Sequence, residues 1–158
     1  MADRLGAPVI KTLPGKAVIP DDSEYAVGGI GLLGTRPGED LVEDCDTVFM
    51  VGTNFPYTQH LPQPGKVRVV QIEADPTRAG VRMPTEVPVI GDAKESLQAL
   101  IPRLTRKTDR SHLMVAGGQA AYLLSSSIRR SMSSSMLPVL GRSRAASWSL
   151  SSVLVWPS

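Results

Sequence analysis

The fold of this chain is constrained most by two apolar runs. Each run stops abruptly at small, polar or turn-forming residues. Residues 47–51 (TVFMV) are followed by Gly-Thr-Asn-Phe-Pro-Tyr, and residues 67–72 (VRVVQI) are followed by Glu-Ala-Asp-Pro. A strand buried on both faces of a parallel sheet has this nearly continuous apolar pattern. The two runs therefore predict parallel strands whose carboxyl ends lead into loops that face a ligand.

Strand-like and helix-like segments alternate along the rest of the chain. Residues 7–13 and 85–90 have the composition of strands, and residues 37–44 have acidic residues near a helix start. A further helix is expected from Asp92, with an apolar stripe that ends near Pro102. This alternation predicts an α/β fold, a Rossmann-like parallel sheet with helices on both faces.

Length and charge narrow the class of protein. A chain of 158 residues is long enough for one domain with a core. The part up to Arg110 carries 13 Lys and Arg residues and all 15 acidic residues, so it has no basic footprint for nucleic acid. No apolar run approaches the roughly 20 residues of a membrane helix. We therefore expect a cytoplasmic protein that binds no nucleic acid and has no membrane span.

The cysteine and the histidines give weak signals for chemistry. Cys45 lies between Asp44 and Asp46, which raise the pKa of a thiol, so a structural cysteine is favoured over a nucleophile. His60 and His112 have no partners that the sequence reveals. Two surface histidines are favoured over a metal pair.

Candidate ligand contacts follow the predicted strands. The glycines of residues 27–34 (VGGIGLLG) let the backbone approach either a neighbouring element or a bound phosphate. Thr53 and Asn54 offer hydrogen-bonding groups. Glu73 ends a strand, where a carboxylate can accept hydrogen bonds from ribose hydroxyls, although a solvated loop carboxylate is the alternative. Asp92 has the spacing of a helix cap with Glu95.

Together these segments resemble a known family. The segments that carry the resemblance are APVIKTLPGK, GGIGLLGTRP, CDTVFMVGTNFPY, VVQIEADP and VPVIGDAKESLQALIP. They resemble the central domain of thiamine-diphosphate-dependent enzymes of the pyruvate oxidase, quinone-linked pyruvate dehydrogenase and acetolactate synthase type. The resemblance covers residues 1–113 and implies a Rossmann-like domain that binds FAD in the flavin-containing members.

The resemblance also implies the residues of an FAD site. It implies that the backbone of one segment lines the flavin, that a second segment forms the next FAD loop, and that Glu73 binds ribose. For Asp92 it leaves two roles open, a helix cap or a further ligand contact. The residues of the first segment are Ile30, Gly31, Leu32 and Leu33, and those of the second are Thr53, Asn54, Phe55, Pro56 and Tyr57. The alternative ligand at these positions is another adenine nucleotide.

The chain departs from the family pattern in two ways. The resemblance implies that full-length members hold Mg2+ and the diphosphate of thiamine diphosphate with a Gly-Asp-Gly motif and a downstream Asn, and activate the thiamine with an amino-terminal glutamate. This sequence contains no Gly-Asp-Gly. Family members also begin this domain with a strand upstream of the helix turn at residues 2–5. We therefore expect a sheet that is incomplete at its N-terminus, in a fragment of an enzyme whose relatives are homodimers or homotetramers.

Residues 114–158 differ in composition from the rest. They contain thirteen serines and four arginines but no Asp, Glu or Lys. Such a composition is typical of disordered segments. We expect an irregular tail, either translated out of frame or a Ser/Arg-rich interaction segment.

The sequence thus supports three hypotheses for function. The first is a fragment of a thiamine-diphosphate-dependent oxidoreductase that decarboxylates pyruvate or a similar 2-oxo acid, inactive alone. The second is a non-catalytic module that binds FAD or another nucleotide, or a partner. The third is an unstable remnant, since a lost strand would expose an apolar sheet edge.

Overall fold

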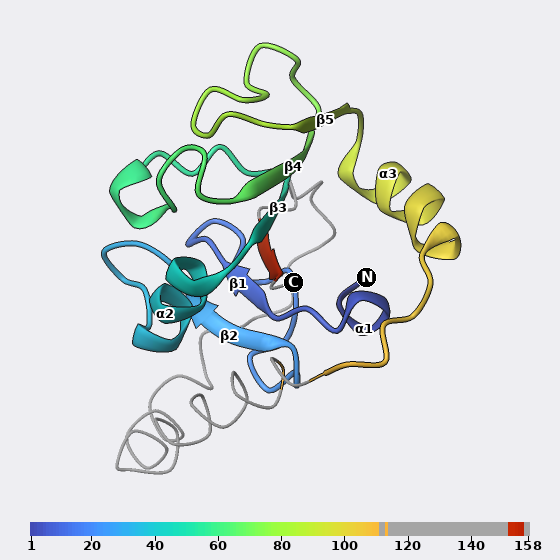
Figure 1. The fold of residues 1–158 in the computed structure, drawn as a ribbon, viewed down its shortest axis with the longest axis horizontal. Coiled ribbons are helices and arrows are strands. Elements are labelled where there is room, and N and C mark those ends of the chain that lie inside the picture. Colours follow the sequence, from blue (N-terminus) through green and yellow to red (C-terminus); the bar gives the residue numbers. More distant parts are fainter. Residues whose placement is uncertain (111–112, 114–151, 157–158) are drawn as a thin grey trace, which may run out of the picture.

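In a computed structural model of the chain, the strands form one six-stranded sheet with the order β2-β1-β6-β3-β4-β5 (Figure 1). The structure describes residues 1–110 and 113, together with the backbone of residues 152–156. In chain order the elements are α1 (Ala2–Leu5), β1 (Val9–Lys11), β2 (Ala26–Gly29), α2 (Arg36–Asp44), β3 (Thr47–Val51), the 3-10 turn η1 (Thr58–His60), β4 (Arg68–Glu73), β5 (Val87–Ile90), α3 (Ala93–Leu100), the 3-10 turn η2 (Ile101–Arg103) and β6 (Ser152–Trp156).

Strands β1 to β5 are parallel wherever they pair with one another, whereas β6 is antiparallel to both of its neighbours. In β3 every side chain from Val48 to Val51 is buried. In β4 the side chains from Gln71 to Glu73 are buried as well. The two apolar runs therefore form inner strands of a largely parallel sheet, and the predicted α/β fold is confirmed.

Helices cover both faces of the sheet. On one face, here called the α2 face, Val42 of α2 lies in a cluster with Ile10, Val48 and Met50. On the other, here called the α3 face, the sheet residues are Val9, Phe49, Val51 and Ile72, and they pack against residues of α1 and α3 that include Ala2, Ala93, Leu97 and Leu100. Alternating side chains of β1 and β3 thus divide between two cores.

The two longer helices begin where the sequence indicates. Thr35 caps α2, because its Oγ1 accepts a hydrogen bond from the Gly38 amide at 3.4 Å. Asp92 caps α3 in the same way, accepting from the Glu95 amide at 3.0 Å. Pro102 lies in η2, so α3 ends before it, as its missing amide requires.

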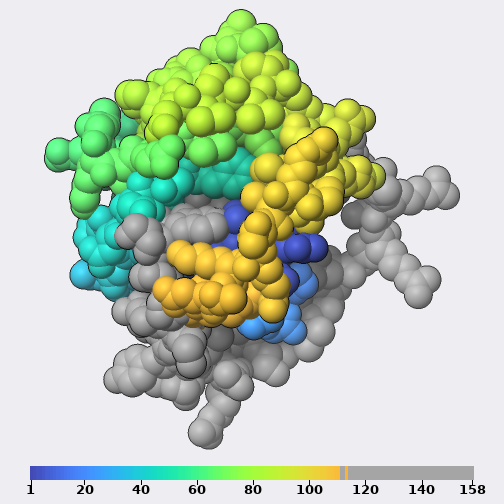
Figure 2. All heavy atoms as spheres, turned by 45° about the vertical axis from the view of Figure 1, so that its right-hand side comes forward, coloured from blue at the N-terminus to red at the C-terminus, as the bar shows by residue number. Residues whose placement is uncertain are grey.

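The segment after α3 returns across the molecule to α1 (Figure 2). The Lys107 amide donates to the Arg4 carbonyl at 2.8 Å. Arg106 and Arg110 form ion pairs with Asp3 at 2.9 and 2.8 Å. These two guanidinium groups hold the pKa of the Asp3 carboxyl well below its usual range. Hydrogen bonds and charge therefore fasten the end of the domain to its beginning.

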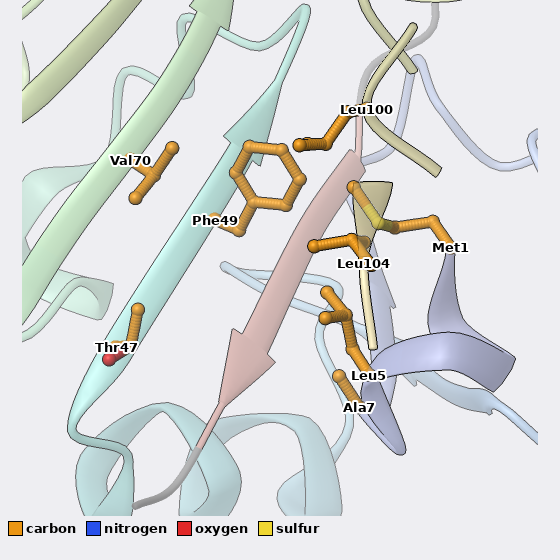
Figure 3. A pocket seen from close by; sticks show the side chains of 8 residues that line it. All are labelled: Met1, Leu5, Ala7, Thr47, Phe49, Val70, Leu100 and Leu104. Atoms are coloured by element: carbon orange, nitrogen blue, oxygen red, sulfur yellow. The ribbon is translucent and has the colours of Figure 1, made fainter. Parts of the chain in front are cut away.

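An apolar pocket of about 180 Å³ opens on the α3 face (Figure 3). Its lining includes Leu5 at the end of α1, Phe49 in β3, Val70 in β4, and Leu100 and Leu104 at and beyond the end of α3. The ribbon of β6 passes beside these side chains. The packing between the sheet and the elements that cover its α3 face therefore leaves a cavity.

The expected tail, residues 114–158, falls almost wholly outside the described residues. Its described part is β6, which lies between β1 and β3 in the sheet. The domain boundary at residue 113 and the origin of the tail stay predictions.

Candidate functional site

The carboxyl ends of the parallel strands meet along one edge of the sheet, and three predicted ligand segments begin there. The turn at residues 30–34 follows β2, the loop at residues 52–57 follows β3, and Glu73 is the last residue of β4. Open parallel sheets bind ligands outside this edge. The structure therefore gathers most of the predicted residues at the edge where a ligand is expected.

The glycines around the turn after β2 serve mainly the packing of α2. Gly28 has a φ of 106°, and a Cβ there would overlap the Thr35 side chain. A Cβ on Gly38 would lie 2.5 Å from the Gly29 carbonyl oxygen. Thr35 Oγ1 also donates to the Val27 carbonyl at 3.1 Å. Close approach of strand and helix is thus sufficient to account for Gly28 and Gly38.

Gly31 brings two predicted segments together. Its φ is 99°, and a Cβ there would lie 3.0 Å from the ring of Phe55. The rings of Phe55 and Tyr57 are 5.5 Å apart between centroids and meet edge to face at 69°. The turn after β2 and the loop after β3 thus form one surface, with Phe55 as the buried contact between them.

Apolar side chains project from this surface into solvent. The exposed fractions are 89% for Leu32, 75% for Leu33 and 52% for Tyr57. Ile30 differs, because its side chain is buried in the core and its amide donates to the Lys11 carbonyl at 3.3 Å. Leu32, Leu33 and Tyr57 are therefore available to a ligand, while the backbone amide of Ile30 is already used.

The polar residues of the loop after β3 hold neighbouring loops in place. Thr53 is buried, and its carbonyl accepts from Gln71 Nε2 at 3.5 Å. Asn54 Oδ1 accepts from Arg82 Nε at 3.2 Å. Gln71 also accepts from the Gly80 amide at 2.9 Å. These contacts link the loop after β3 to the long loop between β4 and β5.

Gln71 and Arg82 were not among the predicted site residues. Gln71 could have been found as a lone amide within the apolar run VVQI, since a buried polar side chain needs hydrogen-bond partners. Arg82 lies in a polar loop with no local signal, because its partner Asn54 is distant in the sequence.

Glu73 fixes a carboxylate at the edge. Its side chain is buried, and Oε1 accepts from the Asp75 amide at 3.3 Å. Its carbonyl accepts from the Gly91 amide at 3.0 Å, which anchors the turn between β5 and α3. The carboxylate is thus buried and oriented by its own turn. The alternative interpretation, a solvated loop carboxylate, does not describe it.

Asp92 follows the neighbouring strand β5, where its side chain caps α3. The helix-cap interpretation is confirmed. A direct contact of Asp92 with a ligand stays a prediction, and the exposed position of the side chain is compatible with one. Pro56 is exposed at the end of the loop after β3.

The surroundings of Cys45 and His60 favour structural roles for both residues. Cys45 is buried, and burial and then the charge of Asp46 raise the pKa of its thiol to about 11, which favours a structural cysteine over an activated nucleophile. His60 Nδ1 lies 3.5 Å from Glu39 Oε1, a partner that the sequence did not reveal. Among the described residues, no group of three His, Cys, Asp or Glu side chains could hold a metal ion. His112 lies outside them.

Comparison with known proteins decides the family. The family described as thiamine pyrophosphate enzyme, central domain, matches residues 1–100. The chain belongs to this family. It therefore contains a thiamine pyrophosphate enzyme central domain, in agreement with the resemblance and with the α/β fold.

Three relatives illustrate the range of the family. The chain is 37% identical over 112 residues to a putative thiamine pyrophosphate-containing protein, YdaP, of Bacillus subtilis (strain 168), an alignment that covers 71% of the chain. It is 29% identical over 110 residues to a probable acetolactate synthase large subunit of Methanocaldococcus jannaschii, covering 66%. It is 25% identical over 108 residues to a pyruvate oxidase of Lactiplantibacillus plantarum, covering 68%.

The aligned region spans only 18–19% of the length of these three relatives. Residues 1–100 of the chain are the part that matches the central-domain family. Within the residues that the structure describes, none of the helices has the length and apolar character needed to cross a membrane.

Proposed function

We propose that the chain supplies the central, FAD-binding domain of a thiamine-diphosphate-dependent oxidoreductase that decarboxylates pyruvate or a similar 2-oxo acid. The observation that carries this proposal is the carboxyl edge of the sheet. There a buried and oriented carboxylate, Glu73, shares the edge with exposed apolar side chains at Leu32, Leu33 and Tyr57. Pyruvate oxidase is among the relatives.

The residues of this edge fit the two halves of FAD. A carboxylate at the end of a parallel strand can accept hydrogen bonds from the ribose hydroxyls of the adenosine half. Exposed apolar side chains can cover part of an isoalloxazine ring, and burying Leu32 and Leu33 in this way would be favourable. Bound FAD would supply an electron acceptor or a structural cofactor. The residues of the chain would bind and orient it.

Thiamine diphosphate and Mg2+ belong to the complete enzyme in this proposal. The Gly-Asp-Gly motif that holds them in the family does not occur in the sequence. We therefore expect the purified chain to show no turnover of pyruvate by itself. Measurable decarboxylation by the chain alone would refute this part of the proposal.

The FAD site is tested by titration of the purified chain. Flavin fluorescence should saturate, and the melting temperature should rise with FAD concentration, because a ligand of the native state stabilises it. NAD and ADP in competition distinguish a site for FAD from a general adenine nucleotide site. The absence of any saturable binding would contradict the proposed site.

Substitution of the carboxylate locates the ligand. Glu73→Gln should weaken FAD binding by about tenfold to a hundredfold, since hydrogen bonds to charged groups contribute roughly 1.5–3 kcal/mol. Glu86→Gln is the matched control, because Glu86 precedes β5 at the opposite edge of the sheet and pairs there with Arg68. Equal losses in the two variants would contradict a ribose contact at Glu73.

A further inference from the structure

One strand of the sheet runs against all the others, and it lies in the interior. Strands β1 to β5 pair in parallel, but β6 fills the position between β1 and β3 in the antiparallel direction. In β6, Leu154 lies opposite Val9 of β1 on one side and Phe49 of β3 on the other. The position between β1 and β3 is here called the central slot.

The order of the other strands calls for a parallel strand in the central slot. From β1 the chain moves outward to β2, and from β3 it moves outward in the other direction to β4 and β5. A doubly wound sheet with this order has a parallel strand at the reversal point. The strand that fills the slot here, β6, lies outside residues 1–100, which match the family.

We propose that the central slot is a strand-exchange site, in which β6 is displaced by an extended apolar strand of a partner polypeptide that runs parallel to β1 and β3. Binding of this kind relies on main-chain hydrogen bonds for affinity and on alternate side chains for selectivity. Both edges of the slot can supply the main-chain groups, because β1 and β3 already pair with β6 there.

The walls of the slot define the chemistry of the partner. Ile10 and Val48 on the α2 face are fully buried, so a strand residue facing that side must be apolar and of moderate size. On the α3 face the apolar pocket of about 180 Å³ lies beside the slot. A partner strand with a large apolar side chain on that side would fill space that Leu5, Phe49 and Leu100 now line (Figure 3).

A disulfide clamp tests whether β6 must leave for the partner to bind. Thr47 lies opposite Trp156, and antiparallel partners have a Cα separation of about 4.5–5.5 Å, within the range of disulfides. The double variant Thr47→Cys/Trp156→Cys should therefore oxidise readily. In the control Thr47→Cys/Ser152→Cys, Ser152 lies opposite Val51, about 13 Å along the strand from Thr47, and no bridge should form.

The probe is a fluorescent peptide with the sequence of β3, residues 47–51. A pair of lysines at each end keeps the peptide in solution. This sequence already occupies an interior parallel position, with buried side chains on both faces. The reduced clamp variant should bind the peptide, and the oxidised form should bind it at least about tenfold more weakly. A peptide with proline in place of the central phenylalanine should not bind, because proline cannot complete the ladder.

A variant with a weakened β6 provides the opposite test. Leu154→Pro removes a ladder hydrogen bond from β6 and should strengthen peptide binding by about tenfold. A single Thr47→Cys variant reports the direction, since only a parallel peptide places its amino end beside Thr47. A peptide with an amino-terminal cysteine should cross-link about tenfold faster than one with a carboxyl-terminal cysteine.

Several results would overturn the proposal. Equal peptide binding by the oxidised and reduced clamp variants would place the peptide elsewhere, and no binding by the reduced variant would mean that the slot does not exchange strands. If the Thr47/Trp156 disulfide failed to form, β6 would not lie beside β3 in the central slot, and the proposal would lose its basis. Faster cross-linking of the peptide with the carboxyl-terminal cysteine would exclude the parallel direction. None of these tests involves FAD, so they are independent of the proposed cofactor site.

Discussion

The two faces of the sheet are completed in different ways. The α2 face is covered by a helix that lies between consecutive strands, and its cluster includes fully buried Ile10 and Val48. The α3 face is covered by α1, α3 and the returning segment, which come from opposite ends of the domain, and it contains the apolar pocket. Loop residues such as Leu61 and Met83 complete the α2 face around α2, whereas the pocket on the α3 face lies where α1, α3 and the returning segment meet.

The difference in packing should appear most strongly in large-to-small substitutions. Ile10→Ala on the α2 face should lower the free energy of unfolding by about 2–5 kcal/mol, because a closely packed site cannot collapse around the cavity. Leu100→Ala, beside the existing pocket, should cost only about 1–2 kcal/mol. Urea unfolding of the two variants measures both values. Similar losses in the two variants would mean that the faces are equally well packed.

The docking of α2 onto the sheet depends on a glycine. Gly28→Ala introduces a Cβ that overlaps Thr35 at a φ of 106°, and we expect a loss of about 2–4 kcal/mol. Gly65→Ala is the matched control, since Gly65 has a φ of 84° but no atom within 4 Å of the added Cβ. Its cost should be near 1 kcal/mol, from backbone strain alone. Equal melting temperatures for the two variants would show that contact with Thr35 contributes nothing.

The elements that the sequence predicts correctly are those with local patterns. The apolar run at residues 47–51, the acidic helix at residues 37–44 and the Asp92 cap are such patterns, and each gave the correct element. Strand β6 is different. Its position depends on pairing with β1 and β3, which are more than a hundred residues away, and it lies in a tail whose composition indicates disorder.

The candidate site shows the same division between local and distant information. The ends of β3 and β4 placed Thr53, Asn54 and Glu73 at the carboxyl edge, as expected from the apolar runs. The sequence could not show that Asn54 accepts from Arg82, because that contact depends on the fold of a loop 28 residues away. Nor could it show that Ile30 turns into the core.

Substitutions that enlarge a side chain should also affect the two faces differently, stabilising the chain at the pocket and destabilising it on the α2 face. Val70→Ile adds one methylene group beside the pocket and should stabilise the chain by about 0.5–1 kcal/mol. Val48→Ile adds the same group to the α2 face, where no part of the side chain is exposed, and should destabilise by about 1–3 kcal/mol. Opposite signs in thermal unfolding are the expected result. Destabilisation by both substitutions would mean that the pocket cannot receive a larger side chain.

The smallest effect concerns the ion pairs that fasten the returning segment to α1. The arginines beside Asp3 lower its pKa in the folded chain, so the pairs stabilise the fold above the ordinary aspartate pKa of about 4 and lose this effect as the pH falls further. Asp3→Asn should therefore be less stable than the parent at pH 7, and the difference should shrink below about pH 4.

The control for this pH dependence is Asp22→Asn, the same change at an exposed position in the turn before β2. Denaturant unfolding from pH 7 to pH 3 gives the difference from the parent for each variant. Added salt should reduce the Asp3 effect at pH 7, because about half of the Asp3 side chain is exposed. A difference between Asp3→Asn and the parent that stayed constant down to pH 3 would place the stabilisation in packing, so the α3 face would be closed without help from charge.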